Sequence, residues 1–171
     1  MKIKDKKVLI IISFFFAFLI IIKILSNHYI INITKSLPRG VYRILPSEEF
    51  KKDDIVVFEI PEETKKYLFD RKYVPSIVTS MMKKVASEKI NDVIEINNNN
   101  ELIINNKNWG KVYKYDSYGR KLPEIDVKKM KVQEGEIFLL SDYSDRSFDG
   151  RYFGVVPINS IKYKVELFFM F

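Results

Sequence analysis

The chain contains no cysteine and only one histidine, His28, among its 171 residues. Without cysteine it has no disulfide bonds, thiol nucleophiles or cysteine-ligated zinc. One histidine cannot build a site that needs several, so the common structural zinc sites are excluded as well. A serine–histidine–aspartate triad would have to use His28, which follows an apolar run closely and is expected at a lipid interface. We therefore predict neither a metal nor an organic cofactor.

The charge pattern does not indicate a nucleic-acid-binding protein, although the net charge is +7 and the pI about 9.3. The lysines are scattered among acidic residues, and no basic run is interleaved with stacking aromatics. A basic surface beside anionic lipid is the more natural interpretation. Hydrophobic residues make up 47% of the chain and aromatics 14%, which is ample for a folded core.

The N-terminal segment is predicted to cross a membrane. Eighteen residues, Val8 to Leu25, are interrupted only by Lys23 and would span about 27 Å as a helix. Four lysines before this run favour a cytoplasmic N-terminus. No small-x-small site follows it, so an uncleaved anchor is favoured over a signal peptide. We expect residues 1–7 in the cytoplasm, 8–25 in a bacterial inner membrane, and 27–171 outside the cytoplasm as one domain.

The rest of the chain is predicted to be mostly β, with one inserted helix. Short apolar or alternating runs separated by turn residues indicate strands. Residues 97–100, NNNN, predict a hairpin turn because asparagine tolerates positive φ. PEETKKYLFDRKY, residues 61–73, predicts a helix, with proline first and acids in its first turn. The predicted strands are 41–45, 54–60, 81–86, 111–115, 136–140 and 160–165.

A serine in the stretch NITKSLPRGVY raises the question of nucleophilic chemistry. The hydroxyl of Ser36 is a weak nucleophile unless a base accepts its proton, and lysine is a known alternative to histidine. A lysine base must be buried, because its pKa has to fall by two to three units to be useful near neutral pH. MMKKVAS offers Lys83 and Lys84 on opposite strand faces. Both faces carry apolar neighbours, so alternation leaves both candidates open.

Four blocks of the sequence together resemble the type I signal peptidases, and most closely their TraF-type conjugative transfer branch. NITKSLPRGVY matches the nucleophile box N-x-T-x-S-x-P-x-G-x-Y, whereas general leader peptidases place one more residue between serine and proline. KKVASEKINDV is similar to the lysine box K-R-V-x-x-L-P-G-D-x-V. DSYGRKLP, residues 116–123, resembles D-x-x-G-R-x-L-P. SDYSDRSFDGRYFGVVP, residues 141–157, resembles the last box, G-D-N-x-x-x-S-x-D-S-R-Y-x-G-x-V.

The resemblance implies a signal-peptidase-like β domain and a role for each matched residue. Ser36 would attack the scissile carbonyl, Lys83 would be the general base, and Ser147 would orient the lysine. Thr34 would form an oxyanion hole with the Ser36 amide. The remaining matched residues would be structural: Pro38 and Gly40 in a rigid turn, and Asp149 with Arg151 in an ion pair linked to Asp142.

Some positions depart from the family pattern. Residues 88–91, EKIN, replace L-P-G-D, so a tight glycine turn is lost, with Asp92 as a partial substitute. Gly-Asp-Asn becomes Ser141-Asp142-Tyr143. Gly150 stands where the family has a serine. All residues with a chemical role are present, which argues against an inactive enzyme.

The resemblance implies a membrane-anchored serine endopeptidase that matures a pilin-type subunit of a conjugative type IV secretion system. Its substrates would be exported, membrane-inserted proteins with small residues before the cut. The alternatives are a general leader peptidase with many clients, and an inactive anchored domain that binds exported partners. Ile30, Ile31 and the C-terminal LFFMF would form an apolar rim on the bilayer or belong to the ordinary core.

Overall fold

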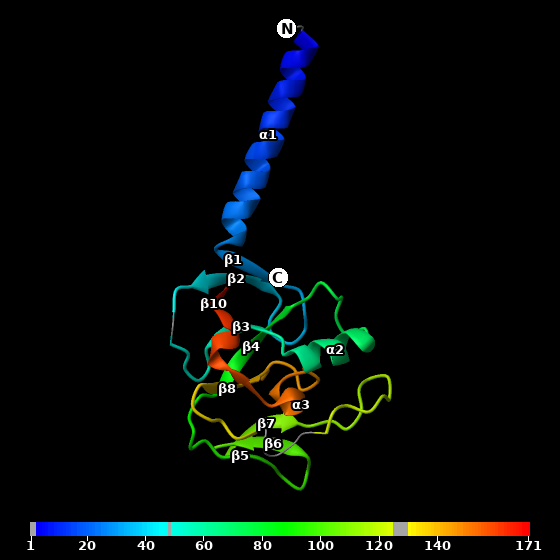
Figure 1. Cartoon of the computed structure of the whole chain (residues 1–171), viewed down its shortest axis with the longest axis vertical. Helices are drawn as coiled ribbons and strands as arrows, with labels where there is room; N and C mark the ends of the chain where they lie inside the picture. The colour runs from blue at the N-terminus through cyan, green and yellow to red at the C-terminus, as the bar shows by residue number, and fades with distance from the viewer. Residues whose placement is uncertain (1–2, 48, 125–129) are drawn as a thin grey trace.

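A long N-terminal helix projects from a β-rich domain in the computed structural model (Figure 1). The structure describes residues 3–47, 49–124 and 130–171. Helix α1 spans Ile3–Ser26. Within it, Lys6–Ser26 has a mean hydropathy of 3.1 and no buried stretch, so this segment is long and apolar enough to cross a membrane. The helix is longer than the predicted apolar run at both ends. It begins among the preceding lysines and ends one residue later, at Ser26.

The domain is built from a seven-stranded sheet and a three-stranded sheet. The order is β1-β2-β10-β3-β4-β8-β9 in the first and β5-β6-β7 in the second. The mostly-β prediction is therefore confirmed. The elements after α1 are β1 (Tyr29–Asn32), β2 (Gly40–Leu45), β3 (Ile55–Glu59), α2 (Glu62–Asp70), β4 (Ser80–Ser87), β5 (Ile94–Ile96), β6 (Glu101–Ile104), β7 (Lys107–Lys111), β8 (Glu136–Leu140), α3 (Gly150–Phe153), β9 (Val155–Pro157), a 3-10 turn (Ile158–Ser160) and β10 (Ile161–Met170).

Strand β4 holds the centre of the domain together. It pairs antiparallel with β3 on one side and β8 on the other. One apolar cluster beside it includes Phe58, Val85 and Leu139, and a second joins Ala86 to Trp109 of the smaller sheet. Because β4 is covered on both faces, its polar side chains are forced either into the interior or to a rim. This placement explains why sequence alternation alone could not separate its two lysines.

Two sequence predictions in the smaller sheet have opposite outcomes. The NNNN hairpin is confirmed, since β5 and β6 pair antiparallel and Asn100 has a φ of 56°. The strand predicted at 111–115 is wrong, because β7 ends at Lys111. Gly110 takes a φ of 92°, and the pairing register of β7 with β6 shifts here, so the ladder cannot continue into 112–115.

The remaining predicted elements occur close to their expected bounds. Helix α2 confirms the 61–73 prediction in a shorter form, with Glu62 and Glu63 in its first turn. Strand β10 runs past the predicted residue 165 to Met170 and pairs with β2. Its last residues are exposed and lie near β1 and the end of α1, so LFFMF is not buried in the core (Figure 1).

Candidate active site

Ser36 lies in the short connection between β1 and β2, and the Asn32 side chain fixes that connection. Asn32 pairs with Gly40 at the base of the hairpin. Its amide Nδ2 donates to the carbonyl oxygens of Leu37 (3.1 Å) and Pro38 (3.0 Å), and its Oδ1 accepts from the backbone N–H of Thr34 (3.1 Å). The buried Asn32 side chain therefore hydrogen-bonds to backbone groups before and after Ser36, and it holds the serine between them.

Pro38 and Gly40 stabilise the same turn in different ways. The Pro38 carbonyl also accepts a hydrogen bond from the Tyr42 hydroxyl at 2.8 Å. Gly40 does not supply the unusual turn conformation expected from the sequence, since it lies in β2. A Cβ at this position would come within 2.2 Å of the Phe169 carbonyl oxygen, so glycine allows β10 to pass closely. That expectation is corrected here: Gly40 serves strand packing.

Lys83 is the buried lysine of β4. Its side chain is 2% exposed, and Nζ donates a hydrogen bond to Ser147 Oγ at 2.7 Å. Burial lowers the pKa of Lys83 from 10.5 to about 8, while the nearby Asp149 raises it and Arg151 lowers it. A substantial fraction of this amine is therefore neutral near pH 8.

Lys84 has a different environment, although it is adjacent in sequence. Its Nζ lies 2.6 Å from Asp142 Oδ2 in an ion pair at the rim. Asp142 was expected to link to the buried pair of Asp149 and Arg151, and it does not. Burial and the hydrogen-bonding partner therefore distinguish Lys83 from Lys84, which strand alternation in the sequence could not do.

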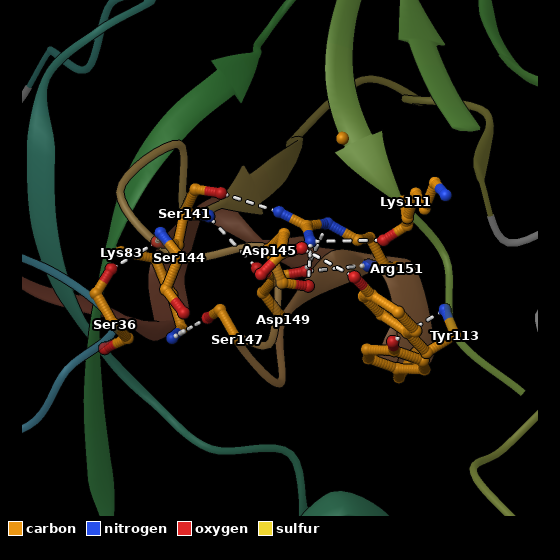
Figure 2. A network of polar contacts seen from close by, with 12 residues as sticks. Ser36, Lys83, Lys111, Tyr113, Ser141, Ser144, Asp145, Ser147, Asp149 and Arg151 are labelled. Atoms are coloured by element: carbon orange, nitrogen blue, oxygen red, sulfur yellow. Dashed lines mark hydrogen bonds and ion pairs between the residues drawn. The ribbon is translucent and has the colours of Figure 1, made fainter. Parts of the chain in front are cut away.

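Ser147 is positioned by a loop that folds around a buried ion pair (Figure 2). Asp149 and Arg151 are both fully buried, with Arg151 Nε 3.4 Å from Asp149 Oδ1. Arg151 also donates to the carbonyl oxygens of Ser141 (2.6 Å) and Asp145 (2.7 Å). The Asp149 carboxylate accepts from the backbone N–H of Ser141 at 3.0 Å. These bonds close the loop that carries Ser147 toward Lys83.

The surroundings of the Ser36 hydroxyl include the Thr34 hydroxyl and the backbone N–H of Ser36. Thr34 Oγ1 lies 3.1 Å from Ser36 Oγ and donates its own proton to Asn32 Oδ1 at 2.7 Å. Thr34 must therefore rotate its hydroxyl away from Asn32 before it can donate to an oxyanion. The Ser36 backbone N–H donates to none of the described residues. It is available to an incoming carbonyl oxygen.

Two residues of the site were not given their roles from sequence. The Ser141 hydroxyl donates to the Ser36 carbonyl oxygen, which ties the loop of Ser147 to the turn of Ser36. In the sequence, Ser141 stood out only because the family pattern has glycine at this position. Asn32 was recognised as part of the motif, but its bracing hydrogen bonds depend on the folded path of the turn.

The other departures are accommodated locally. The segment that replaces L-P-G-D closes with a hydrogen bond from the Asp92 N–H to the Lys89 carbonyl at 3.0 Å, and the Asp92 carboxylate accepts from Ser87 and Asn105. A Cβ at Gly150 would lie 2.8 Å from the Leu139 carbonyl oxygen, so glycine here permits close approach to β8.

Ser36, Lys83 and Ser147 line one half-open cleft of about 660 Å³. Its walls are mainly apolar and aromatic, and they come from β1, β4, the segment between α2 and β4, and the loops around residues 113–122 and 144–148. Across the described ranges 3–47, 49–124 and 130–171, no group of three or more metal-ligating side chains is assembled. A large cleft with mainly apolar walls and a few convergent polar groups is the usual form of a binding site.

The chain matches one family model and is similar to two curated proteins and one solved structure. The model of the signal peptidase family, peptidase S26, matches residues 4–170. Two plasmid transfer proteins TraF from Escherichia coli are similar to this chain: one is 32% identical over 75% of each chain, the other 33% identical over 77% of each. A crystal structure of a signal peptidase I from Enterococcus faecalis V583 aligns with a TM-score of 0.41 and 20% identity, over 69% of this chain and 97% of that one.

Proposed function

Because the chain belongs to the signal peptidase family, peptidase S26, we propose that it is a membrane-anchored serine endopeptidase with Ser36 as nucleophile and Lys83 as general base. Membership implies serine-type peptidase activity on exported preproteins. The observation that carries the residue assignment is the buried Lys83 amine, with a pKa of about 8, bonded to Ser147 in the same cleft as Ser36.

Neutral Lys83 would accept the proton of Ser36 as Oγ forms a bond to the scissile carbonyl carbon. The resulting ammonium would give this proton to the leaving amine as the peptide bond breaks, leaving an acyl-enzyme. Lys83 would then take a proton from water as the water oxygen attacks the ester carbonyl carbon, and would give this proton to Ser36 Oγ as the ester bond breaks, which restores neutral Lys83 and the free serine. With a pKa of about 8, roughly a fifth of Lys83 is neutral at pH 7.4, against about one in a thousand for an ordinary lysine.

Ser147 would keep the amine aimed at the nucleophile, since its hydroxyl accepts from Nζ. The free N–H of Ser36 would donate to the developing oxyanion, with the Thr34 hydroxyl as second donor after rotation. Losing one oxyanion donor typically costs about 3–4 kcal/mol of transition-state stabilisation. Asp149 and Arg151 are assigned a structural role, because both are buried behind Ser147.

The apolar helix and the family fit a membrane-anchored protein. We infer that α1 anchors the chain in the bacterial inner membrane, with residues 1–7 in the cytoplasm and 27–171 outside it. Exposed apolar side chains of β1, of the turn after it and of the C-terminal segment support a site at the membrane surface; they are Ile31, Ile33, Leu167, Phe168, Phe169, Met170 and Phe171. A substrate anchored in the same bilayer would then reach the cleft by a nearly two-dimensional search.

The proposed substrate is a pilin-type subunit of a conjugative type IV secretion system, with small residues before the cut. This proposal is supported by the similarity to the plasmid transfer proteins TraF and by the serine-to-proline spacing of the turn. A general leader peptidase would instead process many preproteins, and a panel of unrelated leader substrates distinguishes the two.

The test is cleavage of a membrane-inserted substrate with a small-x-small site by the full chain in lipid. We expect the native chain and Lys84→Ala to cut, and Ser36→Ala and Lys83→Ala to be inactive while retaining the native circular dichroism spectrum. Lys84→Ala is the matched control, because it removes the neighbouring lysine of the same strand. Cleavage by Ser36→Ala would refute the assignment of the nucleophile.

A further inference from the structure

The cleft carries a fixed cation beside the loop of Ser147. Arg146 lines the cleft, and its guanidinium carbon lies 3.9 Å from the centroid of the Tyr113 ring. Tyr113 is held by its main chain and by its side chain, because its backbone N–H donates to the Tyr152 hydroxyl at 3.1 Å and its own hydroxyl donates to Asp145 at 2.6 Å. Stacking on a braced ring restricts the guanidinium and leaves its N–H edge for a ligand.

The charge of Arg146 is not used by the described parts of the protein. No ion pair joins it to a described carboxylate, and its guanidinium donates no hydrogen bond to a described residue. The one acidic residue that lines the cleft, Asp116, is already paired with Arg120 at 2.7 Å and accepts from Tyr73. Lys35 adds a second exposed cation to the lining. The open cleft therefore presents net positive charge to a bound chain.

The elements on either side of the loop of Arg146 indicate which side of the cut it meets. In a leader substrate the apolar segment precedes the cut and lies in the bilayer, so the residues after the cut lead away from it. Strand β1 lies beside α1 at one edge of the seven-stranded sheet, whereas β8 lies next to the other edge and α3 lies deeper in the domain (Figure 1). The loop of Arg146 joins β8 to α3, so we infer that it meets the mature end of the substrate.

We propose that Arg146, stacked on Tyr113, forms a subsite that selects an acidic side chain within the first few residues after the cut. The inference rests on the proposed function, because it assigns a preference to the same cleft. A guanidinium can bind a carboxylate through two parallel N–H bonds, which gives direction as well as charge. An exposed lysine on a flexible stem, such as Lys35, does not offer this fixed geometry.

The first experiment uses one membrane-inserted substrate with alanine, glutamate or lysine placed after the cut, cleaved by the full chain in nanodiscs. We expect kcat/KM to be about tenfold higher for glutamate than for lysine, the size of one charge-assisted hydrogen bond. Arg146→Gln should reduce this ratio to near one, and Arg146→Glu should reverse it. Lys66→Gln, which removes an exposed cation of α2 outside the cleft, should keep the native ratio.

The second experiment measures binding without catalysis. The Ser36→Ala chain should bind the glutamate substrate more tightly than the lysine substrate in fluorescence anisotropy, and adding Arg146→Gln should remove the difference. Equal kcat/KM for all three substrates, or a glutamate preference that survives Arg146→Gln, would overturn the subsite while leaving the peptidase assignment intact. Failure of the native chain to cut any of the substrates would overturn the proposed function, and the subsite with it.

Discussion

Replacing Lys83 by methionine should stabilise the fold at neutral pH. Burial lowers the pKa of Lys83 from 10.5 to about 8, and each unit between folded and unfolded chain corresponds to about 1.4 kcal/mol. The protonated amine therefore lowers the free energy of unfolding by about 3 kcal/mol. Methionine loses the hydrogen bond to Ser147, worth about 1 kcal/mol. The expected net gain for Lys83→Met is about 2 kcal/mol at pH 7.

The gain should depend on pH in a defined direction. The unfolded chain keeps the lysine proton up to about pH 10.5, whereas the folded chain releases it near pH 8. Between these values the unfolded state binds more protons, so the stability of the native chain rises with pH. The advantage of Lys83→Met is therefore full below pH 8 and is lost as the pH approaches 10.5. Urea unfolding of the detergent-solubilised chain across this range, followed by circular dichroism, measures it.

Lys84→Met provides the matched control for this series. Lys84 is on the same strand but pairs with Asp142 at the rim, so Lys84→Met removes a lysine of β4 and leaves the buried ammonium of Lys83 in place. A constant difference between the native chain and Lys83→Met would refute the reasoning. So would a loss of several kcal/mol for Lys83→Met at pH 7, because either result would mean that burial does not penalise the ammonium.

Three further predictions follow from the same geometry. Asn32→Ala should lower the free energy of unfolding by about 2–3 kcal/mol and reduce peptide cleavage, because it removes the side-chain partners of the buried Leu37 carbonyl and of the Thr34 N–H; urea unfolding and kcat measure this. Gly40→Ala should cost about 1–3 kcal/mol in the same unfolding assay, since its Cβ forces β10 to shift. In the pH profile of kcat/KM, Asp149→Asn should move the midpoint set by Lys83 below its native value, and Arg151→Met should move it above.

The sequence predicts the regular strands well and the short ones poorly. Strands β3, β4 and β8 are apolar runs between turn residues, so composition alone indicates them. Strand β1 follows the anchor so closely that its apolar residues merge with the helix pattern. Strand β7, KNWGK, has little strand propensity and forms because Asn105 and Asn106 both take positive φ and turn the chain back along β6. Whether such a segment forms a strand depends on its pairing with a neighbouring strand.

Some residues of the candidate site can likewise be predicted from the sequence, and others cannot. Motif spacing identifies Ser36, and the need for a buried base narrows the search to two adjacent lysines. The family resemblance assigns the role to Lys83, but strand alternation cannot choose between the two lysines, because β4 is covered on both faces. The contribution of Ser141 could not be predicted from the sequence either. Ser141 lies far from Ser36 in the chain, and only the folded structure brings its hydroxyl to the Ser36 carbonyl oxygen.

The buried ion pair behind Ser147 connects the shape of the site to the charge of its base. Burial sets the low pKa of Lys83, and the opposing effects of Asp149 and Arg151 offset each other. Asp149 alone would hold Lys83 as an ammonium, and Arg151 alone would be an uncompensated buried charge. Arg151 also binds the carbonyl groups of Ser141 and Asp145, at either end of the turn that precedes Ser147. A substitution in this pair therefore alters geometry and proton affinity together, and the pH midpoint of cleavage separates these two effects where a single rate cannot.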